Sequence, residues 1–157
     1  KNSSDGLSPS DEFFYADTPL RIAHNPNFEQ GMTSSIQVGV QMAHPDTQGL
    51  MVCLGDMPLL SPADYQWLLT VFYQHLREDP LAIVQPMFQG QFGHPVIFSN
   101  AYRPAIAALT YPDGCKPILQ AHREHLYRVE SPNEAVLLDA DTPEAYGGML
   151  QSVKERP

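Results

Sequence analysis

Two sets of aspartates come directly after apolar runs of the sequence and could bind a cation. Asp56 follows the run GLMVCLG, and Asp139 and Asp141 end the run AVLLDAD. Carboxylates that converge repel one another unless they are protonated or bridged by a cation, and hard oxygen ligands suit Mg²⁺. An aspartate before a turn or a helix is also a common capping residue, so each set alone leaves both interpretations open. Gly55 favours the ligand-binding interpretation for Asp56, because a glycine lets the backbone approach a ligand closely.

A second group of residues could bind a phosphate or a sugar. The stretch GMTSSI places Gly31 and Met32 directly before Thr33, Ser34 and Ser35, at the predicted start of a helix. Backbone N–H groups and hydroxyls at a helix N-terminus can donate hydrogen bonds to an anion. An ordinary helix cap is the favoured interpretation from composition alone.

The stretch FGHPVIF contributes a histidine to the candidate residues. His94 stands between Gly93 and Pro95 and cannot lie in a regular helix, so we expect it on a loop. There it could donate a hydrogen bond to a ligand or be a plain turn residue, and alone the turn is favoured.

Length, charge and cysteine content limit the class of protein. A chain of 157 residues suits one domain with a sizeable core. The net charge of −9 argues against a nucleic-acid partner, although a bound metal could still attract a phosphorylated small molecule. Cys53 and Cys115 predict neither a disulfide framework nor a zinc site, and we expect Cys53 in the core. No run approaches the ~20 apolar residues of a membrane span, so we expect a cytoplasmic protein with no membrane partner.

Hydrophobic periodicity predicts strands that alternate with helices after a polar arm at 1–19. The helix at 61–79 has the clearest signals, with Ser61 as N-cap, Pro62 at the first helical position and Asp64 completing a capping box. The predicted strands are 20–26, 49–56, 81–88, part of 90–99, 126–130 and 135–141, and the other predicted helices are 31–43, 100–109, 114–125 and Pro143 to about Lys154.

This alternation predicts a single α/β domain at 20–157 with a mostly parallel sheet. The continuous apolar run at 49–56 predicts a strand buried on both faces. Ligands of such sheets bind beyond the carboxyl ends of the strands, where both sets of aspartates lie.

Taken in order, the stretches GMTSSIQVGV, VCLGDMPLLSP, GHPVIF and VLLDADTPEAY resemble the MobA-like nucleotidyltransferases, and among them the molybdenum cofactor cytidylyltransferases. The resemblance extends from about Leu20 to the C-terminus. It implies a Rossmann-like three-layer α/β/α fold of the nucleotide-diphospho-sugar transferase type. It also implies an Mg²⁺-dependent enzyme that transfers CMP from CTP to a molybdopterin-type acceptor and releases pyrophosphate.

The resemblance implies roles for the residues quoted above. Asp56 would be the catalytic aspartate and a metal ligand, with Asp139 and Asp141 as further metal ligands. The nucleotide would bind at Gly31, Met32, Ser34, Ser35 and Gly55, and the acceptor at Gly93, His94 and Pro95.

The chain departs from the family at its beginning. The family opens with a strand and a glycine-rich loop of the form LAAGxSxRMGxxK, and this sequence has no such segment. The N-terminal part that the family has and this sequence lacks amounts to about 50–60 residues, or two strand–helix units. We therefore expect an incomplete domain without its N-terminal strands, inactive by itself. Its exposed apolar surface would be covered by a missing segment or a partner chain. The choice between CTP and GTP is left open.

Two other functions compete with this hypothesis. The DAD stretch is formally a D-x-D pair, as in GT-A-like glycosyltransferases, and a sugar-phosphate nucleotidyltransferase has a related architecture. The position of the pair near the C-terminus and the GHPV stretch count against the glycosyltransferase. Without the glycine-rich loop, the chain could also be a catalytically inactive binding domain.

Overall fold

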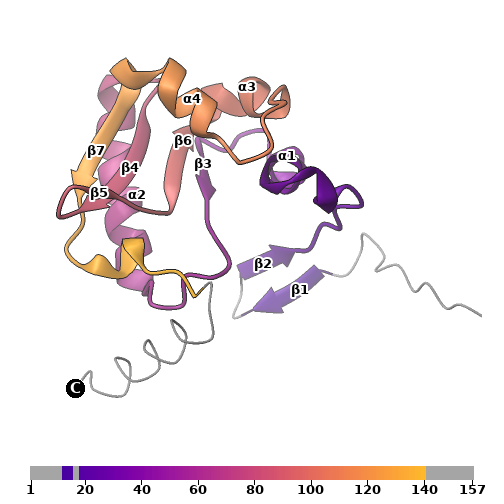
Figure 1. Ribbon diagram of the computed structural model, residues 1–157, viewed down its shortest axis with the longest axis horizontal. Coiled ribbons are helices and arrows are strands. Elements are labelled where there is room, and N and C mark those ends of the chain that lie inside the picture. Colours follow the sequence, from indigo (N-terminus) through magenta and orange to yellow (C-terminus); the bar gives the residue numbers. More distant parts are fainter. Residues whose placement is uncertain (1–11, 16–17, 141–157) are drawn as a thin grey trace, which may run out of the picture.

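A five-stranded sheet forms the centre of the protein, with helices on both of its faces (Figure 1). The computed structural model describes residues 12–15 and 18–140, with side chains from Arg21 onward. The main strand order is β3-β6-β4, with β7 on the other edge of β4 and β5 paired with the end of β4. The strands are β3 (Gly49–Val52), β4 (Ile83–Phe88), β5 (Gln91–Phe92), β6 (Val96–Ser99) and β7 (Leu126–Glu130).

The strand directions match the predicted fold class. Strand β6 is antiparallel to both β3 and β4, and β4 is parallel to β7, so β3, β4 and β7 share one direction. The prediction of a Rossmann-like α/β fold is confirmed, with β6 and the short β5 as the antiparallel members of the sheet.

Successive residues on the strands point to opposite faces, and each face has its own hydrophobic core. On one face Val84 and Ile97 pack against Leu68 and Phe72 of helix α2. On the other, Ile83 packs in a cluster with residues of α1, α3 and α4. The helices are α1 (Met32–Met42), α2 (Pro62–Glu78), α3 (Arg103–Ala107) and α4 (Lys116–Ala121), with 3-10 turns η1 (Phe28–Gln30), η2 (Asn100–Tyr102), η3 (Arg123–His125) and η4 (Glu134–Leu137).

The capping box predicted for α2 is present. The Ser61 hydroxyl accepts a hydrogen bond from the Asp64 N–H, and the Asp64 carboxylate accepts one from the Ser61 N–H at 2.8 Å. The other Asp64 oxygen accepts from the Asn133 side chain at 2.7 Å. The start of α2 is therefore fixed to the residues that precede η4.

Several predicted boundaries are wrong. Strand β1 (Glu12–Tyr15) pairs antiparallel with β2 (Thr18–Arg21), where an arm and then a strand at 20–26 were expected. The helices expected at 100–109 and 114–125 are each divided between a short α-helix and a 3-10 turn.

The strand predicted at 135–141 is also wrong. Its apolar residues begin in the 3-10 turn η4, because the Asn133 side chain accepts a hydrogen bond from the Ala135 N–H and starts a turn there. Ala135 and Val136 are buried in the turn rather than in a sheet. The helix predicted from Pro143 lies outside the described residues.

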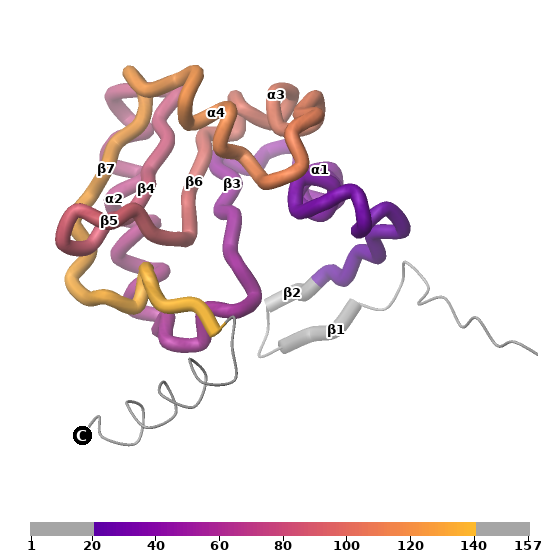
Figure 2. Tube along the Cα trace, in the orientation of Figure 1, coloured from indigo at the N-terminus to yellow at the C-terminus, as the bar shows by residue number. Residues whose placement is uncertain are grey.

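Strand β3 is less buried than its apolar sequence predicted. Leu50 is its only buried residue, and Cys53, which was expected in the core, is exposed. The reason is position: β3 lies at the border of the sheet, next to α1 (Figure 2), and no described strand pairs with its outer edge. Some of the expected exposed apolar surface is present on α1, where Met32 is 49% exposed. The cover of this surface by a missing segment or a partner chain stays a prediction.

No helix in the described part of the chain has the length and hydropathy needed to cross a bilayer.

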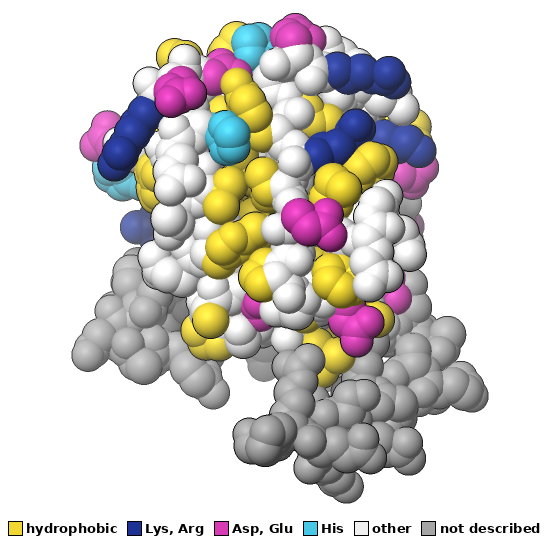
Figure 3. Space-filling model, turned by 90° about the vertical axis from the view of Figure 1, so that its left-hand side faces the viewer, with side chains coloured by type: hydrophobic (Ala, Val, Ile, Leu, Met, Phe, Trp, Pro, Cys, Tyr) yellow, Lys and Arg dark blue, Asp and Glu magenta, His cyan; other side chains and the backbone are white. Residues whose placement is uncertain are grey.

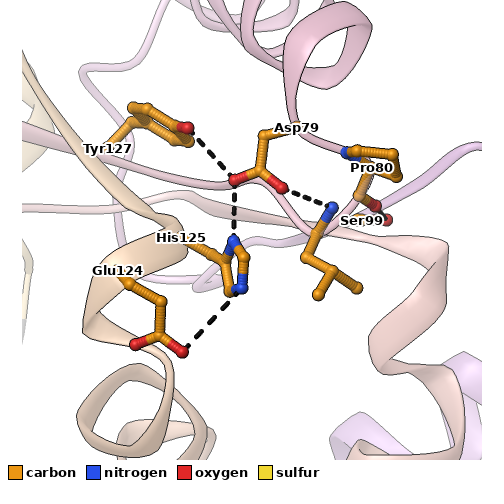
Figure 4. Close-up of polar contacts among 7 residues, drawn as sticks. Asp79, Pro80, Ser99, Glu124, His125 and Tyr127 are labelled. Atoms are coloured by element: carbon orange, nitrogen blue, oxygen red, sulfur yellow. Dashed lines mark hydrogen bonds and ion pairs between the residues drawn. The ribbon is translucent and has the colours of Figure 1, made fainter.

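A polar cluster joins the end of α2 to β7 (Figure 4). Asp79 accepts hydrogen bonds from the Leu81 N–H at 2.9 Å and the Tyr127 hydroxyl at 3.1 Å, and its carboxylate lies 2.9 Å from Nδ1 of His125. Burial alone would raise the pKa of Asp79, but the hydrogen bonds from His125, Leu81 and Tyr127 outweigh it and hold the pKa below its ordinary value.

We expect Asp79→Asn to lower the free energy of unfolding by about 1–2 kcal/mol near pH 7, because the ionised carboxylate is lost from its hydrogen bonds. A lowered folded-state pKa stabilises the protein above the ordinary carboxyl pKa, and this stabilisation disappears as the pH falls through the folded-state value. The difference between variant and wild type should therefore shrink below about pH 4. Urea unfolding at several pH values measures it. Glu78→Gln, one residue earlier, is the control and should change little. A difference for Asp79→Asn that is independent of pH would contradict this account.

Candidate active site

Three loops that are far apart in the sequence are joined beyond the ends of β3, β4 and η4. The Ala140 N–H donates to the Asp56 carbonyl at 2.8 Å, and the His94 N–H donates to the Val136 carbonyl at 2.9 Å. The turn η4 therefore contacts the loop that precedes β6, and the segment after η4 contacts the loop that follows β3 (Figure 2). This arrangement brings together the segments that carry Asp56, His94 and Asp139, and the GMTSS stretch is not part of it.

Gly93 is required where two of these loops meet. A Cβ atom at this position would lie 2.3 Å from the Val136 carbonyl oxygen, far closer than a carbon and an oxygen can approach. The Gly93 N–H also donates to the Pro86 carbonyl at 2.8 Å, which holds the loop against the end of β4. The glycine thus permits the contact that positions His94.

Two buried polar atoms in this region have no hydrogen-bond partner among the described residues. They are Oδ1 of Asp56 and Nδ1 of His94. An unpaired buried carboxylate oxygen is costly, and a cation or a donor from a ligand would satisfy it. The structure therefore offers an acceptor at Asp56 that the protein itself does not use.

Both described aspartates of the site act electrostatically on His94. Burial lowers the pKa of His94, while the charges of Asp56 and Asp139 act in the opposite direction. The net effect is a lowered pKa, so His94 is neutral at neutral pH. Asp139 is exposed, and Asp141 lies outside the described residues.

The residues that the structure describes contain no group of three or more His, Cys, Asp or Glu side chains placed to hold a metal ion. Asp56 and Asp139 therefore provide at most part of a coordination shell. This fits Mg²⁺, which is commonly bound through one or two carboxylates together with substrate oxygens and water.

Three of the predicted nucleotide-binding residues line one groove. Met32, Ser35 and Gly55 belong to the wall of a groove of about 580 Å³ between α1 and β3. Asp56 directly follows Gly55 in the chain but does not itself line the groove.

The hydroxyl groups of the GMTSS stretch are already used within the protein. Thr33 donates to the Tyr111 carbonyl, and Ser34 and Ser35 both accept from the Asn25 side chain, at 2.8 and 2.9 Å. Gly31 has φ of 100°, and a Cβ there would lie 2.7 Å from the Pro112 carbonyl oxygen. These contacts explain the stretch as a helix start that holds neighbouring loops, and the role of Gly31 and Ser34 in nucleotide binding stays a prediction.

His94 lines a second cavity, of about 470 Å³, on the same face of the sheet. The cavity and the groove share the side chains of Met32, Ile36, Val52 and Leu54, so they are neighbours. Gly93 and Pro95 are buried beside His94 and shape the loop rather than line the cavity.

Sequence reasoning missed several residues of this cavity. Gln85 of β4 and Arg128 of β7 both line it. Gln85 had a signal, because it is the only polar residue of the apolar run LAIVQPMF, whereas Arg128 stands in LYRVE together with a second charged residue, Glu130. A buried polar residue in a central strand is unusual and indicates a hydrogen-bonding role.

Comparison with known proteins identifies the family. The sequence profile of the MobA-like NTP transferase domain matches residues 6–126. The chain belongs to the MobA-like NTP transferase family. The matched region of this MobA-like domain contains Asp56 and His94 and ends before Asp139.

Individual relatives agree with this assignment. The molybdenum cofactor cytidylyltransferase of Escherichia coli (strain K12) is 28% identical over 129 residues, which are 81% of this chain and 60% of that protein. A solved structure of a mycobacterial homologue of Rv0371c, from Mycobacterium sp. strain JC1, matches with a TM-score of 0.64 and 22% identity over 79% of this chain and 59% of that one. Rv0371c of Mycobacterium tuberculosis, solved in complex with manganese, matches with a TM-score of 0.61 and 25% identity over 74% and 59%. This MobA-like chain thus spans about 60% of the length of the relatives it matches.

We expect Gly93→Ala to destabilise the MobA-like domain by about 1–3 kcal/mol, because its methyl group would push against the Val136 backbone. Gly55→Ala is the matched control on the neighbouring loop, where a Cβ would meet nothing within 4 Å. It should change the free energy of unfolding by less than about 0.5 kcal/mol. Thermal and urea unfolding of both variants test this, and equal stabilities of the two would show that the close approach of these loops is wrong.

Proposed function

We propose that the chain is the nucleotidyltransferase domain of an enzyme that transfers CMP from CTP to a molybdopterin-type acceptor, with release of pyrophosphate. The observation that carries this proposal is the buried, unpaired Oδ1 of Asp56, whose carboxylate acts electrostatically on His94 in the wall of the cavity. Membership of the MobA-like family and the similarity to the Escherichia coli cytidylyltransferase support the reaction class.

Asp56 and Asp139 would hold a divalent cation between them, with Asp141 as a further ligand. Their oxygen ligands suit Mg²⁺, and the manganese complex of the related mycobacterial protein supports divalent-cation binding. When bound, the cation offsets the negative charge of the phosphates and orients their oxygens. An acidic protein with a net charge of −9 needs such a positive group in order to bind a triphosphate.

The groove and the neighbouring cavity would hold the two substrates. The nucleotide would bind against Met32, Ser35 and Gly55 in the groove, and the acceptor would bind in the cavity beside His94. An oxygen of the acceptor phosphate attacks the α-phosphorus of CTP as the bond to pyrophosphate breaks. The reaction then requires mainly that the two substrates be aligned and their charges stabilised.

His94 would orient the acceptor without adding charge. Its lowered pKa keeps the imidazole neutral, and the unpaired Nδ1 can exchange one hydrogen bond with a ligand. The fixed backbone between Gly93 and Val136 limits how far this side chain can move.

We expect Asp56→Asn to weaken the binding of CTP in the presence of Mg²⁺ or Mn²⁺ by about tenfold or more, which corresponds to about 1.4 kcal/mol. The physical reason is the loss of the charged oxygen that would bind the cation. Isothermal titration calorimetry measures this binding, and Asp46→Asn, at an exposed aspartate that lines neither the groove nor the cavity, is the control and should bind as the wild type does. Unchanged affinity in Asp56→Asn would overturn the metal role.

The choice of nucleotide is tested in the same assay. CTP should bind more tightly than GTP or a UDP-sugar. Preferential binding of a UDP-sugar would favour a glycosyltransferase instead. CTP binding without pyrophosphate release, when the complete protein is given the acceptor, would indicate an inactive binding domain.

A further inference from the structure

We infer that two copies of this chain pair through the outer edge of β7, with the two β7 strands antiparallel and related by a two-fold axis at Val129. The two central sheets then form one continuous sheet, and Arg128 of each copy lies opposite Glu130 of the other. This interface lies on the edge of the sheet that is remote from α1 (Figure 1), and it does not rest on the proposed function.

Strand β7 is an edge strand whose outer side has no partner strand in the described part of the chain. It pairs with β4 alone, in parallel register. The Ser131 N–H donates to the Met87 carbonyl at 2.7 Å, so Ser131 and every second residue before it direct their backbone groups toward β4. The backbone N–H and C=O groups of Leu126, Arg128 and Glu130 therefore point to the outer side, where an added strand can bind them.

The side chains of β7 divide between an apolar and a charged face. Tyr127 and Val129 belong to the hydrophobic cluster under α2, next to the half-buried Trp67. Arg128 lines the cavity on the opposite face, and Glu130 shares that face because it follows two residues later in the strand. A two-fold axis perpendicular to the sheet keeps this division. Apolar side chains of the two copies then meet on one face, and charged side chains meet on the other.

The charges on β7 favour one register of pairing. A two-fold axis at Val129 places each Arg128 opposite the Glu130 of the other copy, which forms two opposite-charge pairs across the edge. Each of these pairs also exchanges two backbone hydrogen bonds, because both residues direct their backbone groups outward. A two-fold axis at Arg128 would instead place two arginines opposite each other, which is destabilising.

Both charged side chains have capacity for a partner. Neither forms an ion pair with a described residue. The Arg128 guanidinium lies 4.1 Å from the centre of the Phe92 ring, a contact that uses none of its N–H donors. The Glu130 carboxylate accepts one hydrogen bond, from the Gln89 N–H at 2.9 Å, and can accept more. Charges on an edge strand can also prevent pairing, but one charge of each sign makes this edge complementary to a second copy of itself.

The surface around β7 has the mixed character of an interface between soluble chains. Figure 3 shows the side of the molecule on which β7 lies in Figure 1. Hydrophobic side chains extend along this side, with Lys, Arg, Asp and Glu side chains beside them. Interfaces that form and dissociate combine apolar and polar groups in this way. Because β7 has only 5 residues, we expect a small interface and a weak dimer.

Sedimentation velocity of the whole chain, at concentrations from about 1 to 200 µM, tests the inference. We expect a reversible monomer–dimer equilibrium that weakens as the salt concentration rises. Arg128→Glu and Glu130→Arg should each weaken the dimer at least about tenfold, because each turns both cross-strand pairs into pairs of like charge. An equimolar mixture of the two variants should form a mixed dimer within about threefold of the wild-type affinity, since both of its pairs again have opposite charges.

Two further variants are the controls. Glu29→Arg reverses an exposed charge in η1, beside α1, and Met32→Glu adds a charge to the groove between α1 and β3. Both should leave the dimer unchanged, and thermal unfolding of every variant verifies that it is folded.

Three results would overturn the inference. The first is a wild-type chain that stays monomeric at all of these concentrations. The second is a dimer that both Arg128→Glu and Glu130→Arg retain, or that Met32→Glu abolishes, because the contact would then lie elsewhere. The third is a dimer that each charge reversal abolishes but that the mixture does not restore, because the two charges would then not face each other across the edge.

Discussion

The candidate site depends on the way η4 and the segment after it are held across the ends of the sheet. Two backbone hydrogen bonds do this, from Ala140 to Asp56 and from His94 to Val136. Without them the loops after β3 and before β6 would have no common neighbour at this end of the molecule. The contact is possible because Gly93 has no side chain where the Val136 carbonyl approaches it. A carboxylate and an imidazole, far apart in the sequence, thus come to act on one another electrostatically.

The two faces of the sheet have different roles. One face carries α2 and an ordinary hydrophobic core, whereas the other, beneath α1 and α4, carries a groove and a cavity that share a wall. Asp56 and Asp139 supply negative charge that acts on His94 in the cavity wall, and the basic residues of α4, η3 and β7 supply positive charge in the lining of the same cavity. Such a separation of charge fits a reaction between a metal-bound triphosphate and an acceptor that is itself anionic.

Local signals allowed the sequence to predict much of the fold. The capping box of α2 is complete within Ser61–Asp64, so its physics does not depend on the rest of the chain. Asp56 could be selected because it follows an apolar strand, and the family resemblance placed it in order with the other motifs. The sequence did not predict features that depend on contacts with other parts of the chain. Cys53 is exposed because β3 has no described strand on its outer edge, and the run at 135–141 starts as a 3-10 turn because Asn133 caps it. Gln85 was missed because the run LAIVQPMF was interpreted only as a buried strand, although Gln85 is its one polar residue.

The central claim is that Asp56 and Asp139 share a divalent cation that binds the phosphates of a nucleotide. A crystal structure of the protein grown with CTP and Mn²⁺, with anomalous diffraction recorded for manganese, tests it most directly. The account predicts an anomalous peak bonded to Oδ1 of Asp56, with phosphate oxygens on its other side and the cytidine in the groove between α1 and β3. A manganese peak away from Asp56, or an Asp56 carboxylate that binds only protein groups while CTP lies elsewhere, would contradict it.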